Sequence, residues 1–172
     1  MVKIAFGYKM GVGKSHAASH ILKQLGGGMH LAFADPLYDI LFYAQDKCGF
    51  QKAKDRKFLQ FIGTEWARDY DETVWVNLLI EKSNLCDNRH QVLEDVRFPN
   101  EFEALKENGW ICIKITRTEP EDRSGNGCKR HRSETSLDII SDKRWDYVIR
   151  NDGTIDEFEA ELESILARIL DF

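Results

Sequence analysis

GYKMGVGKS, residues 7–15, holds most of the pattern of a phosphate-binding loop and is the most informative stretch of this chain. The pattern requires a glycine, four residues of any kind, and then Gly-Lys followed by Ser or Thr. Residues 13–15 satisfy its second half, so the first glycine is expected at position 8. That position holds Tyr8, and Gly7 stands one residue too early. We expect Tyr8 to leave the preceding strand with extended backbone angles, while the later glycines form the tight part of the loop.

The sequence on either side of the loop favours a working phosphate site. An apolar, strand-like run precedes it and a helix-compatible run follows it. Successive backbone N–H groups and a helix N-terminus would surround the anion, Lys14 would reach the terminal phosphates, and the Ser15 hydroxyl would hold Mg²⁺. We therefore expect ATP to bind at Gly11, Val12, Gly13, Lys14, Ser15 and His16. The alternative is a glycine-rich connection with a surface lysine.

Length and composition indicate one soluble globular domain. The chain has 172 residues, of which 42% are hydrophobic and 31% charged. No apolar run approaches the roughly 18–20 residues of a membrane span, and the N-terminus has a strand pattern instead of a secretory signal. The four cysteines are scattered without a Cys-x-x-Cys pair, so neither a zinc site nor a disulfide framework is indicated. We expect a cytoplasmic protein that does not bind membranes.

The charge distribution narrows the class of ligand. A formal net charge of −5 argues against a nucleic acid polymer as partner, whereas the basic loop at 117–132 suggests a small anion bound at one place. The Asn-Lys-x-Asp motif of GTPases is absent from the sequence, and a motor or helicase core would need a longer chain. A small-molecule phosphotransferase is the best remaining class.

Strand-like and helix-like segments alternate along the chain, which predicts an α/β fold with a mostly parallel five-stranded sheet flanked by helices. Asp35 and Pro36 favour a helix start with Asp35 as N-cap, and Thr154 and Glu157 have the spacing of a capping box before a final helix whose buried face includes Ile155. We expect strands at residues 2–6, 29–34, 91–96, 110–115 and 146–150, and helices at 15–25, 35–44, 55–80 with a break near 69–73, 99–109 and from 154 onward.

Four stretches together resemble the deoxynucleoside monophosphate kinases of large DNA phages and some DNA viruses: FADPLYDIL, LQFIGTEWARDYDETVWVNLL, LEDVRFPNEFEAL and HRSETSLD with DYVIRNDGTIDEFEAEL. The family usually has glycine where this chain has Tyr8. The resemblance implies transfer of the γ-phosphoryl group of ATP to a deoxynucleoside monophosphate with Mg²⁺, and a viral protein in the host cytoplasm. It also implies a P-loop kinase core (1–35, 91–116 and 145–172), a helical substrate-binding region (36–85) and an arginine-rich lid (117–134).

Three charged residues are candidates for the phosphate and metal sites. Asp95 ends a buried strand, where it would organise Mg²⁺ through water; capping of the helix at 99–109 is the alternative. Arg97 would contact the substrate phosphate and take part in catalysis, with a structural ion pair as the alternative. Arg68 would bind the substrate phosphate or pair with an internal carboxylate such as Asp35 or Asp69.

The remaining candidates lie on the substrate side and in the lid. Asp35 and Thr64 are assigned to the substrate, and Trp75 or Trp66 would stack on its base unless it belongs to the core. Arginines of the basic loop would close over ATP, exclude water and neutralise developing charge, unless the loop is only a solvated charged segment. We assign Arg117 to ATP, Arg123 and Arg130 to catalysis with Lys14, and Arg132 to the substrate.

Several alternatives stay open from the sequence. Another P-loop small-molecule kinase, of the phosphomevalonate or dephospho-coenzyme A type, would share the loop and lid. A nucleotide-binding regulatory protein without catalysis is the rival from another class. The apolar segment Val74–Ile80 is either core or a dimer face, so the protein is a monomer or a homodimer, and we favour core.

Overall fold

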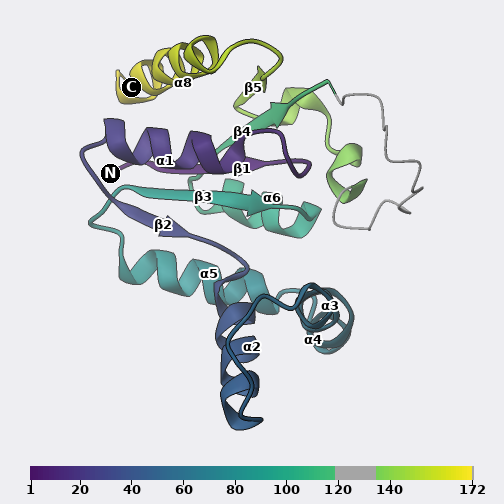
Figure 1. Cartoon of the computed structure of the whole chain (residues 1–172). Coiled ribbons are helices and arrows are strands. Elements are labelled where there is room, and N and C mark those ends of the chain that lie inside the picture. Colours follow the sequence, from purple (N-terminus) through teal and green to yellow (C-terminus); the bar gives the residue numbers. More distant parts are fainter. Residues whose placement is uncertain (119–134, 172) are drawn as a thin grey trace.

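The computed structural model describes residues 1–118 and 135–171, and within them five parallel strands form one sheet in the order β2-β3-β1-β4-β5 (Figure 1). Apolar runs of β-branched and aromatic residues form the central strands, which are buried on both faces as a parallel sheet requires. The strands are β1 (Lys3–Gly7), β2 (Met29–Leu31), β3 (Gln91–Val96), β4 (Ile111–Thr116) and β5 (Tyr147–Arg150). The predicted α/β fold with a parallel sheet is confirmed.

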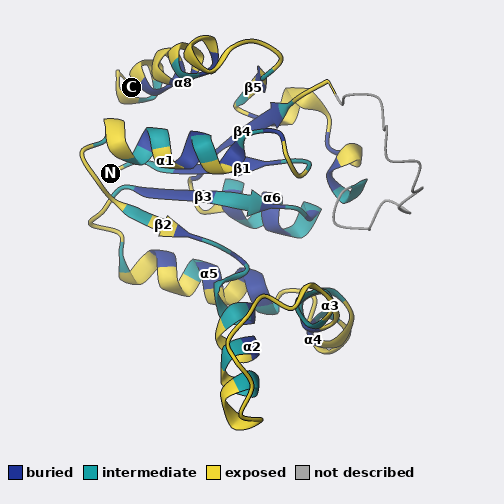
Figure 2. Cartoon of the chain, in the orientation of Figure 1, coloured by how far each residue is buried: buried dark blue, intermediate teal, exposed yellow. Residues whose placement is uncertain are grey.

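Helices cover both faces of the sheet, and two apolar clusters lie between the layers. Side chains alternate along β1, so Ile4 and Phe6 face α1 (Lys14–Gln24) and α8 (Ile155–Leu170), whereas Ala5 faces the opposite cluster. That second cluster includes residues of α5 (Val74–Leu85) and α6 (Pro99–Glu107). Figure 2 shows the buried strands sandwiched between helices whose outer sides are exposed.

A group of helices extends from one edge of the sheet. Figure 1 shows α2 (Asp35–Lys47) projecting away from the strands, with α3 (Arg56–Gln60) and α4 (Ala67–Tyr70) beside it. A π-helical turn, η1 (Phe61–Trp66), joins α3 to α4. The helical structure is then interrupted before α5, as the sequence predicted. Trp75, Val76 and Leu79 of α5 are buried against the sheet, which confirms the core interpretation of this segment.

Two local predictions at helix termini were wrong. Ala34, not Asp35, is the N-cap of α2, and the Asp35 carboxylate instead pairs with Lys82 Nζ of α5 at 2.9 Å. The Thr154–Glu157 capping box at the start of α8 is confirmed, with Thr154 N donating to Glu157 Oε2 at 2.7 Å. However, Ile155 is 59% exposed because the first turn of α8 begins beyond the edge of the apolar cluster.

The region after β4 contains short 3-10 helices before β5 is reached: η2 (Ser136–Ile139) and η3 (Asp142–Arg144). Leu137, Ile140 and Trp145 bury this segment against the same face as α5 and α6. No helix among the described residues combines the length and the apolar character needed to cross a bilayer. The division into core, substrate-binding region and lid stays a prediction.

Candidate active site

The carboxyl ends of β1 and β3 bring the phosphate-loop motif beside the Asp-Val-Arg segment. These strands are adjacent and parallel, with Gly7 in register with Val96. The loop follows Gly7 directly, while Asp95 and Arg97 flank Val96. Ligands of open parallel sheets bind at this edge, where neighbouring strands send their connections to opposite faces. The site is therefore built from two segments roughly ninety residues apart in sequence.

The loop has the glycine conformations that the motif demands. Gly11 and Gly13 have φ of 79° and 106°, in the left-handed region that favours glycine. Gly13 is the N-cap of α1, so the helix N-terminus points its free N–H groups into the loop. Lys14 is buried, and its ammonium donates to the carbonyl of Tyr8 at 3.1 Å and to that of Lys9. Ser15 is exposed at the first turn.

Tyr8 does not have the extended angles that we expected. Its φ is 100°, so a tyrosine adopts the left-handed conformation that the motif normally assigns to glycine. Burial raises the pKa of its phenol, as does a hydrogen bond with Asp138. The Lys114 ammonium lies 4.1 Å from the ring centroid and pairs with Asp142 at 2.7 Å. These contacts offset a conformational cost of about 1–2 kcal/mol.

Gly7 and Asn151 support the loop from the sheet. A Cβ on Gly7 would lie 2.5 Å from the Trp145 ring. Glycine is therefore required at this position for close packing against Trp145, and not for the conformation of the loop. Asn151, which follows β5, donates from Nδ2 to the Val12 carbonyl at 2.9 Å. A Cβ on Gly13 would lie 2.6 Å from the same amide nitrogen. Sequence reasoning missed Asn151, whose only signal was its place in the RNDGT stretch.

A cleft of about 510 Å³ opens beside the loop, between the ends of β2 and β3 and the helices α2 to α4. Met10 of the loop contributes to its wall. Aromatic and apolar side chains supply much of the surface, and cationic groups are distributed over it. The lining residues that matter here are Phe33, Tyr38, Lys54, Arg56, Thr64, Arg68, Trp75, Asp95, Arg97, Phe98 and Glu101.

Arg68 and Glu101 form a buried ion pair in this cleft. Arg68 NH2 donates to Glu101 Oε1 at 2.6 Å, and its guanidinium lies 4.1 Å from the Phe98 ring centroid. The second Glu101 oxygen accepts from the amides of Arg97 and Phe98 at 2.8 and 3.0 Å. Burial raises the pKa of Glu101 to about 7, although Arg68 and the amides oppose that rise. Arg68 thus has an internal carboxylate partner, and it is not Asp35 or Asp69.

Asp95 lies at the end of β3 with both oxygens held by backbone amides. Oδ1 accepts from Phe33 N and Oδ2 from Ala34 N, each at 3.0 Å. Burial raises the pKa of the carboxyl, while the two amides and Arg97 lower it. The N-cap alternative for the helix after it is wrong, because Phe98 is the N-cap of α6 and the Asp95 oxygens accept from the amides of Phe33 and Ala34.

Comparisons with known proteins agree on one family. The profile of the deoxynucleotide monophosphate kinase family matches residues 51–162. A protein of Acanthamoeba polyphaga mimivirus, provisionally named a deoxynucleotide monophosphate kinase, is 34% identical, with 95% of each chain covered. The chain belongs to the deoxynucleotide monophosphate kinase family. An uncharacterized protein of Ictalurid herpesvirus 1 (strain Auburn) is 35% identical over 95% of this chain and 69% of its own length.

The fold of this kinase is shared with solved P-loop kinases. Dephospho-CoA kinase from Campylobacter jejuni superposes with a TM-score of 0.61 at 18% identity, covering 97% of this chain and 96% of that one. At this identity the likeness concerns the fold alone. The family and the fold together make the protein a phosphotransferase of the kinase class.

The structure brings together some of the kinase's predicted site residues and separates others. Thr64, Arg68, Trp75, Asp95 and Arg97 all line the cleft. Trp75 is 3% exposed and donates its indole N–H to the Gly63 carbonyl at 3.0 Å, so it belongs to the core. Trp66 is exposed on its helix and packs edge-on against Tyr70.

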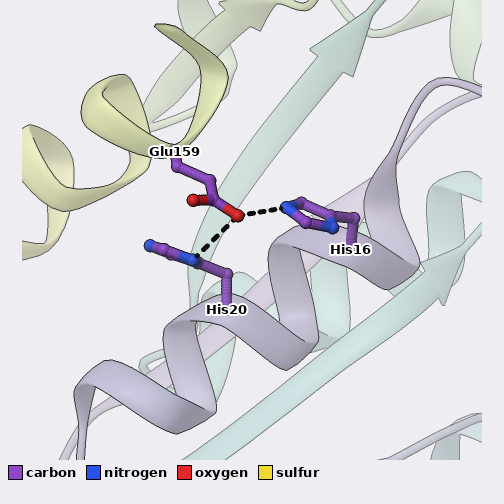
Figure 3. A group of neighbouring side chains, drawn as sticks. All are labelled: His16, His20 and Glu159. Carbon is purple, nitrogen blue, oxygen red and sulfur yellow. Dashed lines mark hydrogen bonds and ion pairs between the residues drawn. The ribbon is translucent and has the colours of Figure 1, made fainter. Parts of the chain in front are cut away.

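Other predicted residues lie elsewhere. Asp35 is not among the lining residues of the cleft and faces Lys82 instead. The His16 side chain turns toward α8 and contacts Glu159 (Figure 3). Arg117 is exposed just after β4, whereas Arg123, Arg130 and Arg132 lie outside the described residues. Their assignments to ATP, catalysis and substrate stay predictions.

Cationic residues of the cleft that the sequence did not reveal come from the start of α3 and the segment just before it. Lys54 and Arg56 line the cleft from its exposed side, and the Lys54 ammonium lies 6.0 Å from the Tyr38 ring centroid. In the sequence they belong to a polar stretch with the ordinary appearance of a surface connection. Only the tertiary fold brings them into the lining of the same cleft as Arg97.

Proposed function

We propose that this kinase transfers the γ-phosphoryl group of ATP to a deoxynucleoside monophosphate, giving ADP and the deoxynucleoside diphosphate. One observation carries the proposal: a cleft with aromatic walls and cationic side chains opens directly beside a glycine-rich phosphate loop. Phosphoryl transfer requires two anions held close together, with their charge neutralised. The loop supplies one anion site and the cleft supplies the other.

The loop is suited to hold the ATP phosphates. The first amides of α1 and the amides around Gly11 and Gly13 are the donors for phosphate oxygens. Lys14 now bonds backbone carbonyls of the loop, and a phosphate oxygen is a stronger acceptor for an ammonium than a neutral carbonyl. We expect ATP to draw the Lys14 ammonium away from these carbonyls onto its terminal phosphates.

The residues present fit a magnesium ion. Mg²⁺ prefers oxygen ligands and keeps several waters, and the Ser15 hydroxyl is exposed at the loop. The Asp95 oxygens accept one amide each, so each has a lone pair left for a water of the ion. When bound, Mg²⁺ would neutralise charge on the β- and γ-phosphates. Ser15 and Asp95 are the side chains that we propose for it.

The cleft is suited to hold the nucleotide acceptor. Arg97 stands nearest in sequence to the strand end beside the loop, so we assign it to the acceptor phosphate. Thr64, and Arg56 on the exposed side, are further polar groups for phosphate or sugar. Phe33, Tyr38 and Phe98 provide flat apolar surface for a base. The ion pair with Glu101 fixes Arg68 in the cleft wall and in that way shapes the pocket.

The test is ADP release from Mg-ATP by purified protein, with dTMP, dGMP, dCMP, dAMP and their ribose counterparts offered one at a time. Stimulation by one or more deoxynucleotides would support the proposed reaction and define its base range. The Lys14→Ala variant is the negative control, and its turnover should fall by roughly 10²–10³-fold. Lys23→Ala, an exposed lysine of the same helix, is its matched control.

Two other outcomes would redirect the proposal. Activity with phosphomevalonate or dephospho-coenzyme A, and none with nucleotides, would assign a different acceptor to the same fold. ATP binding that depends on Lys14, without ADP release for any acceptor, would favour a non-catalytic nucleotide-binding protein.

A further inference from the structure

Three potential metal ligands converge between the first and last helices of the described chain. His16 and His20 are four residues apart on α1, so both side chains lie on the same face of that helix. Glu159 of α8 points between them, as Figure 3 shows. Its Oε1 lies 2.8 Å from His16 Nε2 and 3.4 Å from His20 Nδ1. One ligand atom from each residue lies within 4.8 Å of the other two.

We propose that His16, His20 and Glu159 bind a divalent transition-metal ion, Zn²⁺, which clamps α1 to α8. Two imidazole nitrogens and one carboxylate oxygen are a recurrent ligand set for zinc, with water in the fourth position. Tetrahedral zinc with bonds of about 2.0–2.2 Å separates its ligand atoms by about 3.3 Å. The observed separations of 2.8 and 3.4 Å reach this value with small side-chain rotations.

The groups around the site orient the second histidine for a metal. His20 Nε2 lies 3.1 Å from Glu163 Oε1, which also accepts from Gln24 Nε2 at 2.7 Å. A metal-ligating histidine commonly donates its other ring N–H to a carboxylate in this way, which fixes its tautomer and orientation. His20 would therefore carry its proton on Nε2 and present the lone pair of Nδ1 to the ion.

Exposure and chemistry distinguish this site from the magnesium site of the reaction. The His20 side chain is 9% exposed, whereas those of His16 and Glu159 are 39% and 34% exposed, so the ion has a path from solvent. Mg²⁺ prefers six oxygen ligands and is a poor match for two imidazoles. Because His16 follows Ser15 directly, zinc here would hold the first turn of the phosphate-loop helix against α8.

The competing explanation is a pair of histidine–glutamate contacts held by protons alone. Both explanations predict that losing His20 weakens the packing of α1 on α8. Only the metal site predicts a stabilisation that depends on zinc and on all three ligands. The decisive quantity is therefore the zinc-dependent shift in melting temperature, and not the stability of a variant by itself.

The experiment uses the full chain without a histidine tag, stripped of metal by EDTA, dialysed, and titrated with ZnCl₂ in the absence of nucleotide. We expect one ion per chain by calorimetry and a rise in melting temperature of roughly 5–10 °C at about 100 times the dissociation constant. His20→Asn and Glu159→Gln should each weaken binding by at least about 10-fold. His30→Asn is the control, because His30 lies 3.7 Å from Glu94 as a lone histidine–glutamate pair.

Cobalt serves as the spectroscopic probe of ligand identity. Co²⁺ at this site should give d–d bands without a thiolate charge-transfer band. A thiolate band would place the ion on cysteines, of which Cys48 is exposed, and would overturn the proposal. Absence of zinc binding by the unmodified chain would also overturn it. So would zinc binding by both ligand variants that is as tight as that of the unmodified chain. If one variant does not fold, the other decides.

Discussion

Single side chains in the cleft show how burial controls charge. Glu101 is 2% exposed, so removing its carboxylate from water disfavours ionisation even with Arg68 at 2.6 Å. The pair does not maximise stability, because desolvation of both ions opposes their attraction. Its effect is to hold Arg68 and the backbone of Arg97 in one arrangement beside the proposed acceptor site.

The raised pKa of Glu101 predicts a stability that falls as pH rises. The folded carboxyl has a pKa of about 7 against its ordinary value of 4.5, so between these values the folded state retains a proton that the unfolded state has lost. From pH 5 to 7.5 the wild type should lose about 2 kcal/mol of unfolding free energy relative to Glu101→Gln. Urea unfolding at several pH values measures this, with exposed Glu107→Gln as control. Parallel curves for wild type and Glu101→Gln would contradict the prediction.

Arg97→Ala tests which phosphate this arginine serves. We expect a loss of about 10²-fold in kcat/KM for the deoxynucleoside monophosphate, because a charged donor to a phosphate is removed. The KM for ATP should change little. Steady-state kinetics with each substrate varied in turn measures both effects. Arg144→Ala is the control, since Arg144 pairs with Glu103 at 2.6 Å outside the cleft. Equal losses for both substrates would move Arg97 to the ATP side.

The phosphate loop depends on neighbouring segments for its shape. Tyr8 has a left-handed backbone, and Lys114 of β4 and Asp138 of η2 contact its side chain. On the other side of the loop, the segment between β5 and α8 supplies Asn151 to the Val12 carbonyl. The loop is thus positioned by contacts from both sides and not by its own glycines alone.

Asn151→Ala should loosen the loop without removing any proposed ligand of ATP. The loss of one partly buried hydrogen bond should lower the unfolding free energy by about 1 kcal/mol and raise the KM for ATP severalfold. Kinetics and urea unfolding measure the two effects. Asn108→Ala is the matched control, because the Asn108 side-chain amide donates to the Ala104 carbonyl at the end of its own helix. An unchanged KM for ATP in Asn151→Ala would show that the loop holds its shape without this contact.

The whole molecule combines a net charge of −5 with a cleft whose lining holds four cationic side chains and two carboxyl groups. Lys54, Arg56, Arg68 and Arg97 converge there from separate segments. Local positive potential in a cleft draws anionic substrates by long-range attraction, which salt screens over roughly 10 Å at 0.1 M. The proposed acceptor binding should therefore weaken as ionic strength rises.

Arg56→Gln should weaken that salt dependence. In the wild type the KM for the deoxynucleoside monophosphate should rise with KCl, and in Arg56→Gln it should start severalfold higher and rise less steeply. Initial rates across a KCl series measure both slopes. Lys57→Gln is the control, because it removes one exposed charge of the same helix outside the cleft lining. The same slope in all three proteins would exclude a role for Arg56 in the attraction.

Local sequence patterns were sufficient to predict the order of strands and helices along the chain, the position of the phosphate loop, the helix break before α5 and the capping box of α8. These features follow from apolar periodicity and from the backbone requirements of a few residue types, which act over several neighbouring residues. The same patterns placed Asp95 and Arg97 near one sheet edge, because strand ends of a parallel sheet meet there.

Folding added the partners that lie far apart along the chain. Arg68 and Glu101 are 33 residues apart, Asn151 and Val12 139, and His16 and Glu159 143. No periodicity reports such pairs, since each depends on how helices pack across the sheet. The left-handed backbone of Tyr8 also depends on tertiary structure, because the side chains that contact Tyr8 and offset its conformational cost come from β4 and η2. Residue types thus predicted the kind of site, and packing selected which side chains meet in it.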